Sequence, residues 1–207
     1  MYTPPAFRED DPQALQAMME GAGLATLVTA TAEGLMATPL PLLFDPDEGP
    51  HGTLYGHLAR ANLQWRTPAL GEAMVLFPGA DAYVSPGWYA AKREHGKVVP
   101  TWNYAAVHAY GTATFFEDAD RLLALVTRLT NHHEAGRAEA WKVDDAPEAF
   151  IAAQLRGIVG LRLEISRIEG KRKMSQNRGA EDRAGVTEGL RREGGEQALA
   201  VAGQIPV

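Results

Sequence analysis

The strongest basic cluster in the sequence is the segment 170–178, Gly-Lys-Arg-Lys-Met-Ser-Gln-Asn-Arg. Side chains alternate between the two faces of an extended strand, so Lys171, Lys173 and Ser175 share one face if this segment is extended. Two ammonium groups beside a hydroxyl form a suitable clamp for a phosphate. The same pattern also fits a small nucleic-acid patch or a solvated strand edge protected by lysines. Taken alone, the segment favours the solvated edge, and a phosphate site requires a second segment that converges on it.

A second candidate for phosphate binding lies at 56–62, where a predicted strand passes into a short predicted helix. Arg60 and Asn62 stand close to the start of that helix. The free backbone N–H groups of a helix start and a guanidinium both bind phosphate well. The alternative interpretation is a surface arginine followed by a helix N-cap, a role that asparagine also fills. From these residues alone, the alternative is favoured.

The segment 99–111 is the most unusual part of the chain, because small and aromatic residues alternate along it. One face of the predicted strand carries Asn103, Ala105, Val107 and Ala109. The other face carries Trp102, Tyr104, His108 and Tyr110. The first face suits the interior of a narrow barrel. The second is too aromatic and too polar for plain exposure, so it indicates a ligand or a partner subunit, and a second core layer beneath helices explains it equally well.

Helix and strand signals along the chain predict a mainly β protein with attached helices. Asp11 and Pro12 begin a helix that Gly21 ends. Further helices are expected at 61–70, 118–133 and 147–155, and strands at 24–31, 35–44, 53–58, 73–77, 82–85, 98–116 and 158–168. The polar segment 90–97 is expected to be mobile, and the stretch from 178 to be partly helical. This many strands with few helices between them favours an antiparallel barrel over a doubly wound parallel sheet.

Composition excludes several kinds of chemistry. The chain of 207 residues has no cysteine, which excludes disulfides, thiolate nucleophiles and Fe–S clusters and fits a cytoplasmic protein. The neighbours His132, His133 and Glu134 do not share a helix face, so no metal site is expected. No apolar run approaches the roughly 20 residues of a membrane helix, so no membrane association is expected. The formal net charge of −6 gives no support to direct DNA binding.

Five separated motifs resemble, in order, those of a known family. They are Met1-Tyr2-x-Pro4-x-x-Phe7, Gly56-His57-x-Ala59-Arg60-x-Asn62, Tyr83-x-Ser85-Pro86-x-Trp88-Tyr89, Val99-Pro100-Thr101-Trp102-Asn103-Tyr104 and Gly170-Lys171-x-Lys173-x-Ser175-Gln176-Asn177. This set is similar to the PaiB family of FMN-binding negative transcriptional regulators. The resemblance runs from Met1 to about residue 190, so we expect one domain at 1–190 and a peripheral C-terminal tail at 191–207.

The resemblance implies an antiparallel FMN-binding split β-barrel, similar to those of pyridoxamine-phosphate oxidases and flavin reductases. It also implies a homodimer with the flavin sites at the subunit interface, and FMN held without a covalent bond. The aromatic face of the segment 99–111 then becomes a candidate dimer surface. The implied cofactor-binding residues are Thr38, His57, Arg60, Asn62, Thr101, Trp102, Asn103, Lys173, Ser175 and Gln176. Arg60 and Lys173 are implied as phosphate contacts.

Thr38 marks a departure from the family pattern, because many relatives carry histidine at this position. A threonine hydroxyl can hydrogen-bond a flavin or a phosphate, but it cannot act as a base near neutral pH. His57 and His108 remain candidate proton donors.

Three functions are compatible with these expectations. The first is a flavin-binding regulatory protein, which acts on transcription directly or through metabolism or a protein partner. The second is an FMN-dependent oxidoreductase or flavin reductase that acts on a small molecule. The third is a flavin store without chemistry of its own. The sequence identifies no catalytic residue, substrate or electron donor.

Overall fold

The computed structural model describes residues 1–206, which divide into two compact units. The sheet unit contains Ala22–Phe77 and His108–Ile168. The terminal unit contains Met1–Gly21, Pro78–Val107 and Glu169–Val207. No helix among the described residues is both long enough and apolar enough to cross a bilayer.

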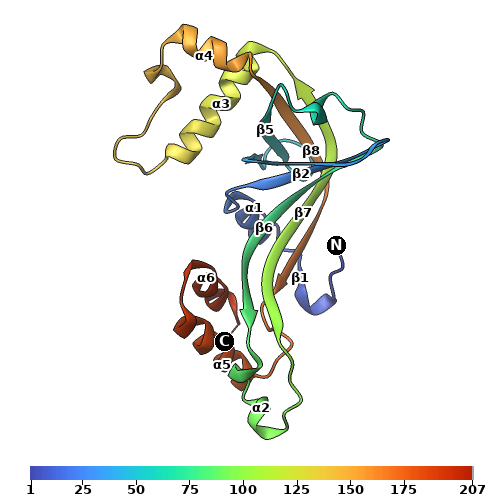
Figure 1. The fold of residues 1–207 in the computed structure, drawn as a ribbon, viewed down its shortest axis with the longest axis vertical. Helices are drawn as coiled ribbons and strands as arrows, with labels where there is room; N and C mark the ends of the chain where they lie inside the picture. Colours follow the sequence, from blue (N-terminus) through green and yellow to red (C-terminus); the bar gives the residue numbers. More distant parts are fainter. Residues whose placement is uncertain (207) are drawn as a thin grey trace. The chain divides into compact units, whose positions relative to one another are not determined.

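The elements follow one another along the chain as drawn in Figure 1. The strands are β1 (Arg8–Glu9), β2 (Ala25–Thr31), β3 (Gly34–Leu40), β4 (Leu43–Asp45), β5 (Thr53–Ala59), β6 (Ala73–Val84), β7 (Thr101–Phe116) and β8 (Ile158–Lys173). The α-helices are α1 (Pro12–Glu20), α2 (Ala91–Glu94), α3 (Ala119–Glu134), α4 (Glu148–Leu155), α5 (Ala180–Glu193) and α6 (Glu196–Gln204). Single 3-10 turns are η1 (Pro5–Phe7), η2 (Leu63–Trp65), η3 (Pro86–Trp88) and η4 (Val143–Asp145).

The sheet unit is built on a sheet whose strand order is β3-β2-β6-β7-β8-β5-β4. β2 pairs with β3 and β6, and β5 pairs with β4 and β8, in each case antiparallel. In the part of the chain that the structure describes, the edge strands β3 and β4 do not pair with each other, so the sheet stays open. The prediction of a mainly β, antiparallel architecture with attached helices is confirmed.

The core of the sheet unit follows from alternation along β8. Val159, Leu161, Leu163 and Ile165 are all 0% exposed, as the sequence pattern predicts. The helix α3 covers part of this unit. Its N-cap Asp118 accepts a hydrogen bond from the Arg121 backbone N–H at 2.9 Å, and its buried leucines pack with Leu43 and the ring of Tyr55. Removal of this apolar surface from water is what holds the helix on the sheet.

The terminal unit has its own core. The helices α5 and α6 pack against each other and bury Val186, Leu190 and Val201 with Tyr89 and Met174. The segment 191–207, expected to be peripheral, contains α6, whose Val201 and Ala202 are 0% and 3% exposed. In this unit β1 also pairs with the end of β8.

Three predicted elements differ from the structure. The predicted strand 35–44 is divided into β3 and β4, because Pro41 lacks the N–H that a continuous ladder needs. The predicted helix 61–70 is only the turn η2, since Pro68 disfavours helical backbone at Thr67. The predicted strands 73–77 and 82–85 form one strand, β6. Gly79 permits the continuous strand because it has no side chain. A Cβ at this position would lie 2.8 Å from the Cβ of Ala105, which is too close.

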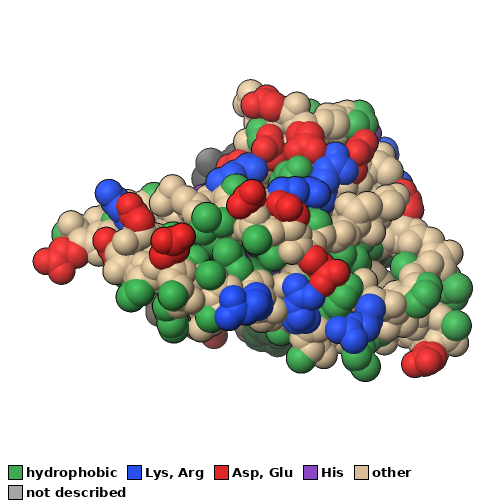
Figure 2. Space-filling model, turned by 90° about the horizontal axis from the view of Figure 1, so that it is seen from above, with side chains coloured by type: hydrophobic (Ala, Val, Ile, Leu, Met, Phe, Trp, Pro, Cys, Tyr) green, Lys and Arg blue, Asp and Glu red, His purple; other side chains and the backbone are tan. Residues whose placement is uncertain are grey.

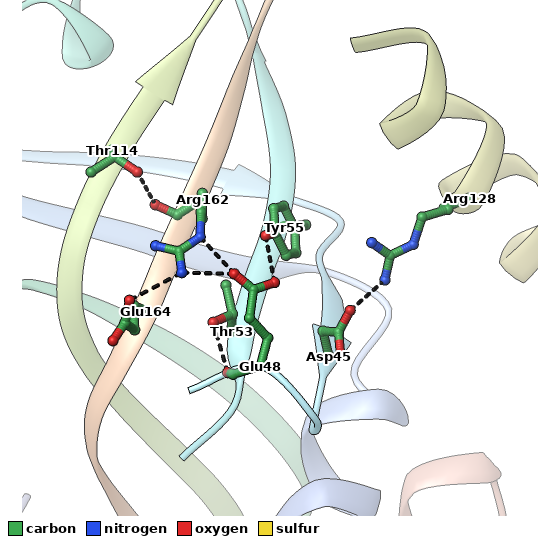
Figure 3. A network of polar contacts seen from close by, with 8 residues as sticks. All are labelled: Asp45, Glu48, Thr53, Tyr55, Thr114, Arg128, Arg162 and Glu164. Atoms are coloured by element: carbon green, nitrogen blue, oxygen red, sulfur yellow. Dashed lines mark hydrogen bonds and ion pairs between the residues drawn. The ribbon is translucent and has the colours of Figure 1, made fainter. Parts of the chain in front are cut away.

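A polar network fastens the β4–β5 loop to β8 in the sheet unit (Figure 3). The Arg162 guanidinium donates to Glu48 Oε1 from Nε and Nη2, at 2.9 and 2.7 Å. The Tyr55 hydroxyl donates to Glu48 Oε2 at 2.6 Å. The hydrogen bonds from Tyr55 and then from Arg162 lower the pKa of Glu48. The Glu48 carboxylate is therefore ionised near neutral pH and tethers the loop through both of its oxygens.

The lowered pKa of Glu48 predicts a pH-dependent contribution to stability. A carboxylate whose pKa is lower in the folded state stabilises the fold above the unfolded value of 4.5 and loses this effect as the pH falls through its folded value. We expect Glu48→Gln to be less stable than the wild type at about pH 7, with a difference that shrinks as the pH falls below 4.5. Urea denaturation at a series of pH values measures this difference. Glu33→Gln, in the exposed β2–β3 turn, is the control. A Glu48→Gln defect that is independent of pH would contradict the assignment.

Candidate functional site

The predicted site residues fall into two groups, one in each unit. In the sheet unit, Thr38 on β3 lies within hydrogen-bond distance of Asn62 and Gln64, which follow β5. Asn62 Nδ2 donates to Thr38 Oγ1 at 2.8 Å, and Thr38 Oγ1 donates to Gln64 Oε1 at 2.5 Å. Asn62 Oδ1 also accepts a hydrogen bond from the Gln64 backbone N–H at 2.9 Å, so Asn62 caps η2 as well. The two interpretations of Asn62, helix cap and site residue, are therefore compatible.

Gln64 fixes the polarity of this network, and the sequence analysis did not identify it. The side chain is 1% exposed. Its Nε2 lies 3.2 Å from both the Leu27 and Met36 carbonyl oxygens, which can only accept, so the nitrogen must face them. Oε1 then faces Thr38 and requires a donor there. The only sequence signal for Gln64 was its position two residues after Asn62.

A cavity of about 420 Å³ lies beside Gln64 in the sheet unit. Its polar lining includes Thr29, Gln64, Arg66, Thr67 and Thr112. Arg66 is the single charged residue in that lining, and its guanidinium carbon lies 4.6 Å from the centroid of the Trp65 ring. Hydroxyls, an amide and one cation give this cavity hydrogen-bonding groups suited to a polar or anionic ligand.

The guanidinium of Arg60, expected to be free to contact a phosphate, is already bound to other groups of the chain. Its Nε donates to the Arg156 carbonyl at 2.7 Å, and Nη2 donates to the Ile158 carbonyl at 3.2 Å. Nη1 donates to the Glu117 carboxylate, which balances the charge. Arg60 thus ties the loop after β5 to the start of β8. A phosphate at this position would share the guanidinium with Glu117, and the predicted phosphate role stays a prediction.

His57 lies on β5, opposite Gly160 on β8. Its Nδ1 is buried and has no hydrogen-bond partner among the described residues. Burial lowers the pKa of His57, because the charged imidazolium loses its hydration. The imidazole is therefore neutral near pH 7, which makes it a poor acid. The other candidate proton donor, His108, places its ring edge-on to the Tyr110 ring, with centroids 6.3 Å apart.

In the terminal unit, Asn103 on β7 and Ser175 form a buried pair. The residues are 1% and 4% exposed. Asn103 Nδ2 donates to Ser175 Oγ at 3.0 Å, and Ser175 Oγ lies 3.2 Å from Asn103 Oδ1. Ser175 has φ 60° and is the one described non-glycine residue with positive φ. Such a backbone costs roughly 1–2 kcal/mol, so the turn after β8 is held in a demanding conformation.

Gln176 stabilises the same turn. Its Oε1 accepts a hydrogen bond from the Met174 backbone N–H at 2.6 Å, and its Nε2 donates to the Arg172 carbonyl. The predicted residues Ser175 and Gln176 therefore shape the backbone around Lys173 through their own side chains.

Lys173 lies beside Thr101 and Trp102 at the start of β7. Its Nζ donates to the Thr101 hydroxyl and, at 2.6 Å, to the Trp102 carbonyl oxygen. Burial is the first cause that lowers the pKa of Lys173, and the charges of Lys171 and Arg178 lower it further. Within residues 1–206, none of these three cations forms an ion pair. Three mutually repelling cations without a counter-ion make an electropositive site.

Lys171 is the most buried of the three, at 7% exposed. Its Nζ donates to the Tyr2 carbonyl oxygen at 3.1 Å and lies 4.9 Å from the centroid of the Tyr104 ring. Arg178 places its guanidinium carbon 4.7 Å from the centroid of the Tyr89 ring. Aromatic faces thus help to hold two cations that form no ion pair among the described residues.

The fold is shared with solved flavoprotein structures. The flavocytochrome Anf3 from Azotobacter vinelandii has a TM-score of 0.61 at 15% identity, with 86% of this chain and 75% of that chain covered. The FAD and heme binding protein from Mycobacterium smegmatis has a TM-score of 0.59 at 17% identity, with 91% of this chain and 80% of that chain covered. At these identities the likeness establishes the fold alone. With the open antiparallel sheet, it confirms the predicted split-barrel class.

The family is established by sequence. A family model described as "Putative FMN-binding domain" matches residues 1–167. Over 194 residues, the chain is 35% identical to the protease synthase and sporulation protein PAI 2 of Bacillus subtilis (strain 168), which covers 93% of this chain and 90% of the relative. The chain belongs to this family of FMN-binding domains, and the resemblance to the PaiB family is confirmed.

Proposed function

We propose that this protein binds FMN without a covalent bond and that the cations around Lys173 hold the phosphate. The observation that carries the proposal is the group of three cations that lacks any carboxylate partner within the described residues. A phosphate dianion would relieve the repulsion among them and form charge-assisted hydrogen bonds with Lys173. Bound FMN would supply a ring that accepts and releases electrons. The chain itself would orient that cofactor and exclude water from it.

The neighbours of Lys173 support a positioning role. Thr101 and the Trp102 carbonyl hold the Lys173 ammonium in place, and the Asn103–Ser175 pair fixes the turn beyond it. A lysine held in this way loses less conformational freedom on binding, which favours affinity for the ligand.

We further propose that the protein is a cytoplasmic homodimer, as the family resemblance implies. The edge strand β3 supports an association through the sheet unit, because among residues 1–206 it pairs with β2 alone and it carries Leu35 at 77% exposed. An unpaired strand edge with an exposed apolar side chain is a suitable surface for a second chain.

The proposed regulatory role is indirect, through metabolism or a protein partner. The name of the Bacillus relative connects that protein with protease synthesis and sporulation. The formal net charge of this chain is −6. On the face drawn in Figure 2, basic side chains occur in small groups with acidic ones between them, and no continuous basic surface is visible. Direct binding to DNA relies on neutralising many phosphates, so this charge pattern favours an indirect mechanism.

The first prediction about function concerns Lys173. Lys173→Ala should weaken FMN binding at least about tenfold more than riboflavin binding, because only FMN carries the phosphate and a lost charge-assisted contact is worth about 1.5–3 kcal/mol. Arg172→Ala is the matched control, since Arg172 is the adjacent cation and is already paired with Glu9. Flavin fluorescence titration measures both affinities. Equal losses for the two flavins would remove Lys173 from the phosphate role.

The second prediction concerns Arg60 and its partner Glu117. If Arg60 also contacts the phosphate, the Glu117 carboxylate competes with that phosphate for Nη1. Glu117→Gln should then tighten FMN several-fold and leave riboflavin unchanged. The same titration serves as the measurement, with Glu139→Gln as the exposed control. An unchanged ratio of the two affinities would show that Arg60 serves only to tie the loop to β8.

The third prediction concerns DNA. In a mobility-shift assay at physiological salt, the protein should bind upstream DNA of regulated genes no more tightly than random DNA, with or without FMN. Salt must be fixed, because non-specific affinity falls steeply with ionic strength. A specific shift that persists at about 150 mM salt would contradict indirect regulation and establish direct repression.

A further inference from the structure

A cavity in the terminal unit brings together two exposed aromatic rings. Its volume is about 480 Å³, and it is lined by residues of β6, β7 and the α5–α6 junction. Tyr83 and Trp102 line it and are 42% and 52% exposed. Their ring centroids lie 6.1 Å apart and their planes meet at 72°, so the rings form a corner. Large aromatic surfaces left open in a concave site indicate a ligand.

The charges that line this cavity are all negative. They belong to Asp81, Glu193 and Glu196, and no Lys, Arg or His is part of the lining. None of the three carboxylates forms an ion pair within residues 1–206. The three acidic side chains give the lining of this cavity a formal negative charge. This is the reverse of the charge around Lys173 in the same unit.

Glu193 lies at a helix end of partial negative charge, whereas Glu196 lies in the first turn of α6, where free N–H groups carry partial positive charge. Glu193 is the last residue of α5. The free carbonyl groups at a helix C-terminus carry partial negative charge, so a carboxylate at that end is disfavoured unless a cation lies close by. Arg191 and Arg192 lie in the same turn, but neither lines the cavity.

The walls of the cavity are held by the chain itself. The Asp81 backbone N–H donates to Gln197 Oε1 at 3.2 Å, which joins β6 to α6. Gly194 and Gly195 have φ 74° and 84°, a conformation that lets the chain reverse between α5 and α6. A cavity whose shape exists before a ligand arrives costs little to organise on binding.

We propose that this cavity binds a small organic cation of the alkylammonium type. The alkyl groups would lie against the rings of Tyr83 and Trp102, and the carboxylates would balance the charge. Aromatic corners bind quaternary ammonium groups because the ring faces carry negative potential and the methyl groups are also apolar. Carboxylates exclude an anion, whereas the rings contribute nothing to a hydrated metal ion. A neutral apolar molecule would contact the rings favourably but would gain no attraction from the carboxylates.

This site shares Trp102 with the implied flavin contacts and differs from them in its carboxylates. Asn103 faces the opposite side of β7 from Trp102, and Trp102 meets Lys173 only through its backbone carbonyl. The ring of Trp102 also belongs to the face that the family resemblance offers as a dimer surface. The carboxylates Asp81 and Glu193 are not implied as flavin contacts, so they separate the two proposals experimentally.

The test is calorimetric titration of the full chain with choline and with 3,3-dimethylbutan-1-ol, in which a carbon replaces the charged nitrogen. Choline should bind saturably and at least about tenfold more tightly than the alcohol, the ratio that corresponds to about 1.4 kcal/mol of cation-specific attraction. Trp102→Leu and Glu193→Gln should each weaken choline about fivefold or more. Trp141→Leu removes a tryptophan of similar exposure, 45%, from outside the cavity and should leave choline binding unchanged.

Each alternative occupant gives a contrary result. If a second copy of the chain covers the rings, choline produces no saturable heat, and the proposal fails. If the carboxylates hold only an inorganic cation, Mg²⁺ displaces choline and Trp102→Leu has no effect, which also overturns it. FMN affinity measured on Glu193→Gln should equal that of the wild type. Loss of choline binding with FMN binding intact therefore separates this proposal from the flavin site.

Discussion

Alternation of side chains along β7 is the constraint on which the terminal unit depends. Asn103 and Ala105 are 1% and 5% exposed, because this face of the strand packs inward. The intervening positions, Trp102 among them, must then face the other way. One strand thus presents a buried amide to Ser175 on one side and an exposed indole on the other. A slip of one residue would exchange the two faces and destroy both sites at once.

The distribution of charge matters more than its sum. The chain is acidic overall, yet Lys171, Lys173 and Arg178 repel one another without a carboxylate partner in the described residues. Elsewhere in the same unit, Asp81 and Glu193 form no ion pair within residues 1–206. Each arrangement costs electrostatic free energy in the absence of a ligand, and each is relieved by a ligand of opposite sign. An acidic protein can therefore hold an anionic cofactor without a basic surface.

The parts of the fold that local sequence controls were predictable. Three examples are the alternation in β8, the helix cap at Asp118 and the helix start at Asp11–Pro12. In each, the residues that determine the local structure are close neighbours in the sequence. The helix expected at 61–70 failed because Pro68 outweighed the apolar pattern. The partners of side chains were not predictable, since Arg60 meets Glu117 from 57 positions away. The family motifs identified Arg60 as a candidate phosphate contact. They could not show that the Glu117 carboxylate already balances its charge.

The network at Thr38 shows which hydrogen bonds a threonine makes where the family resemblance implies a histidine. The carbonyls that face Gln64 Nε2 fix its amide, and the η2 cap fixes Asn62, so the residue between them must accept from Asn62 and donate to Gln64. A hydroxyl meets this requirement with one atom, and a neutral imidazole could meet it with its two nitrogens. Threonine therefore preserves the hydrogen-bond pattern of a neutral histidine. A threonine hydroxyl cannot hold an extra proton near neutral pH, as an imidazole can.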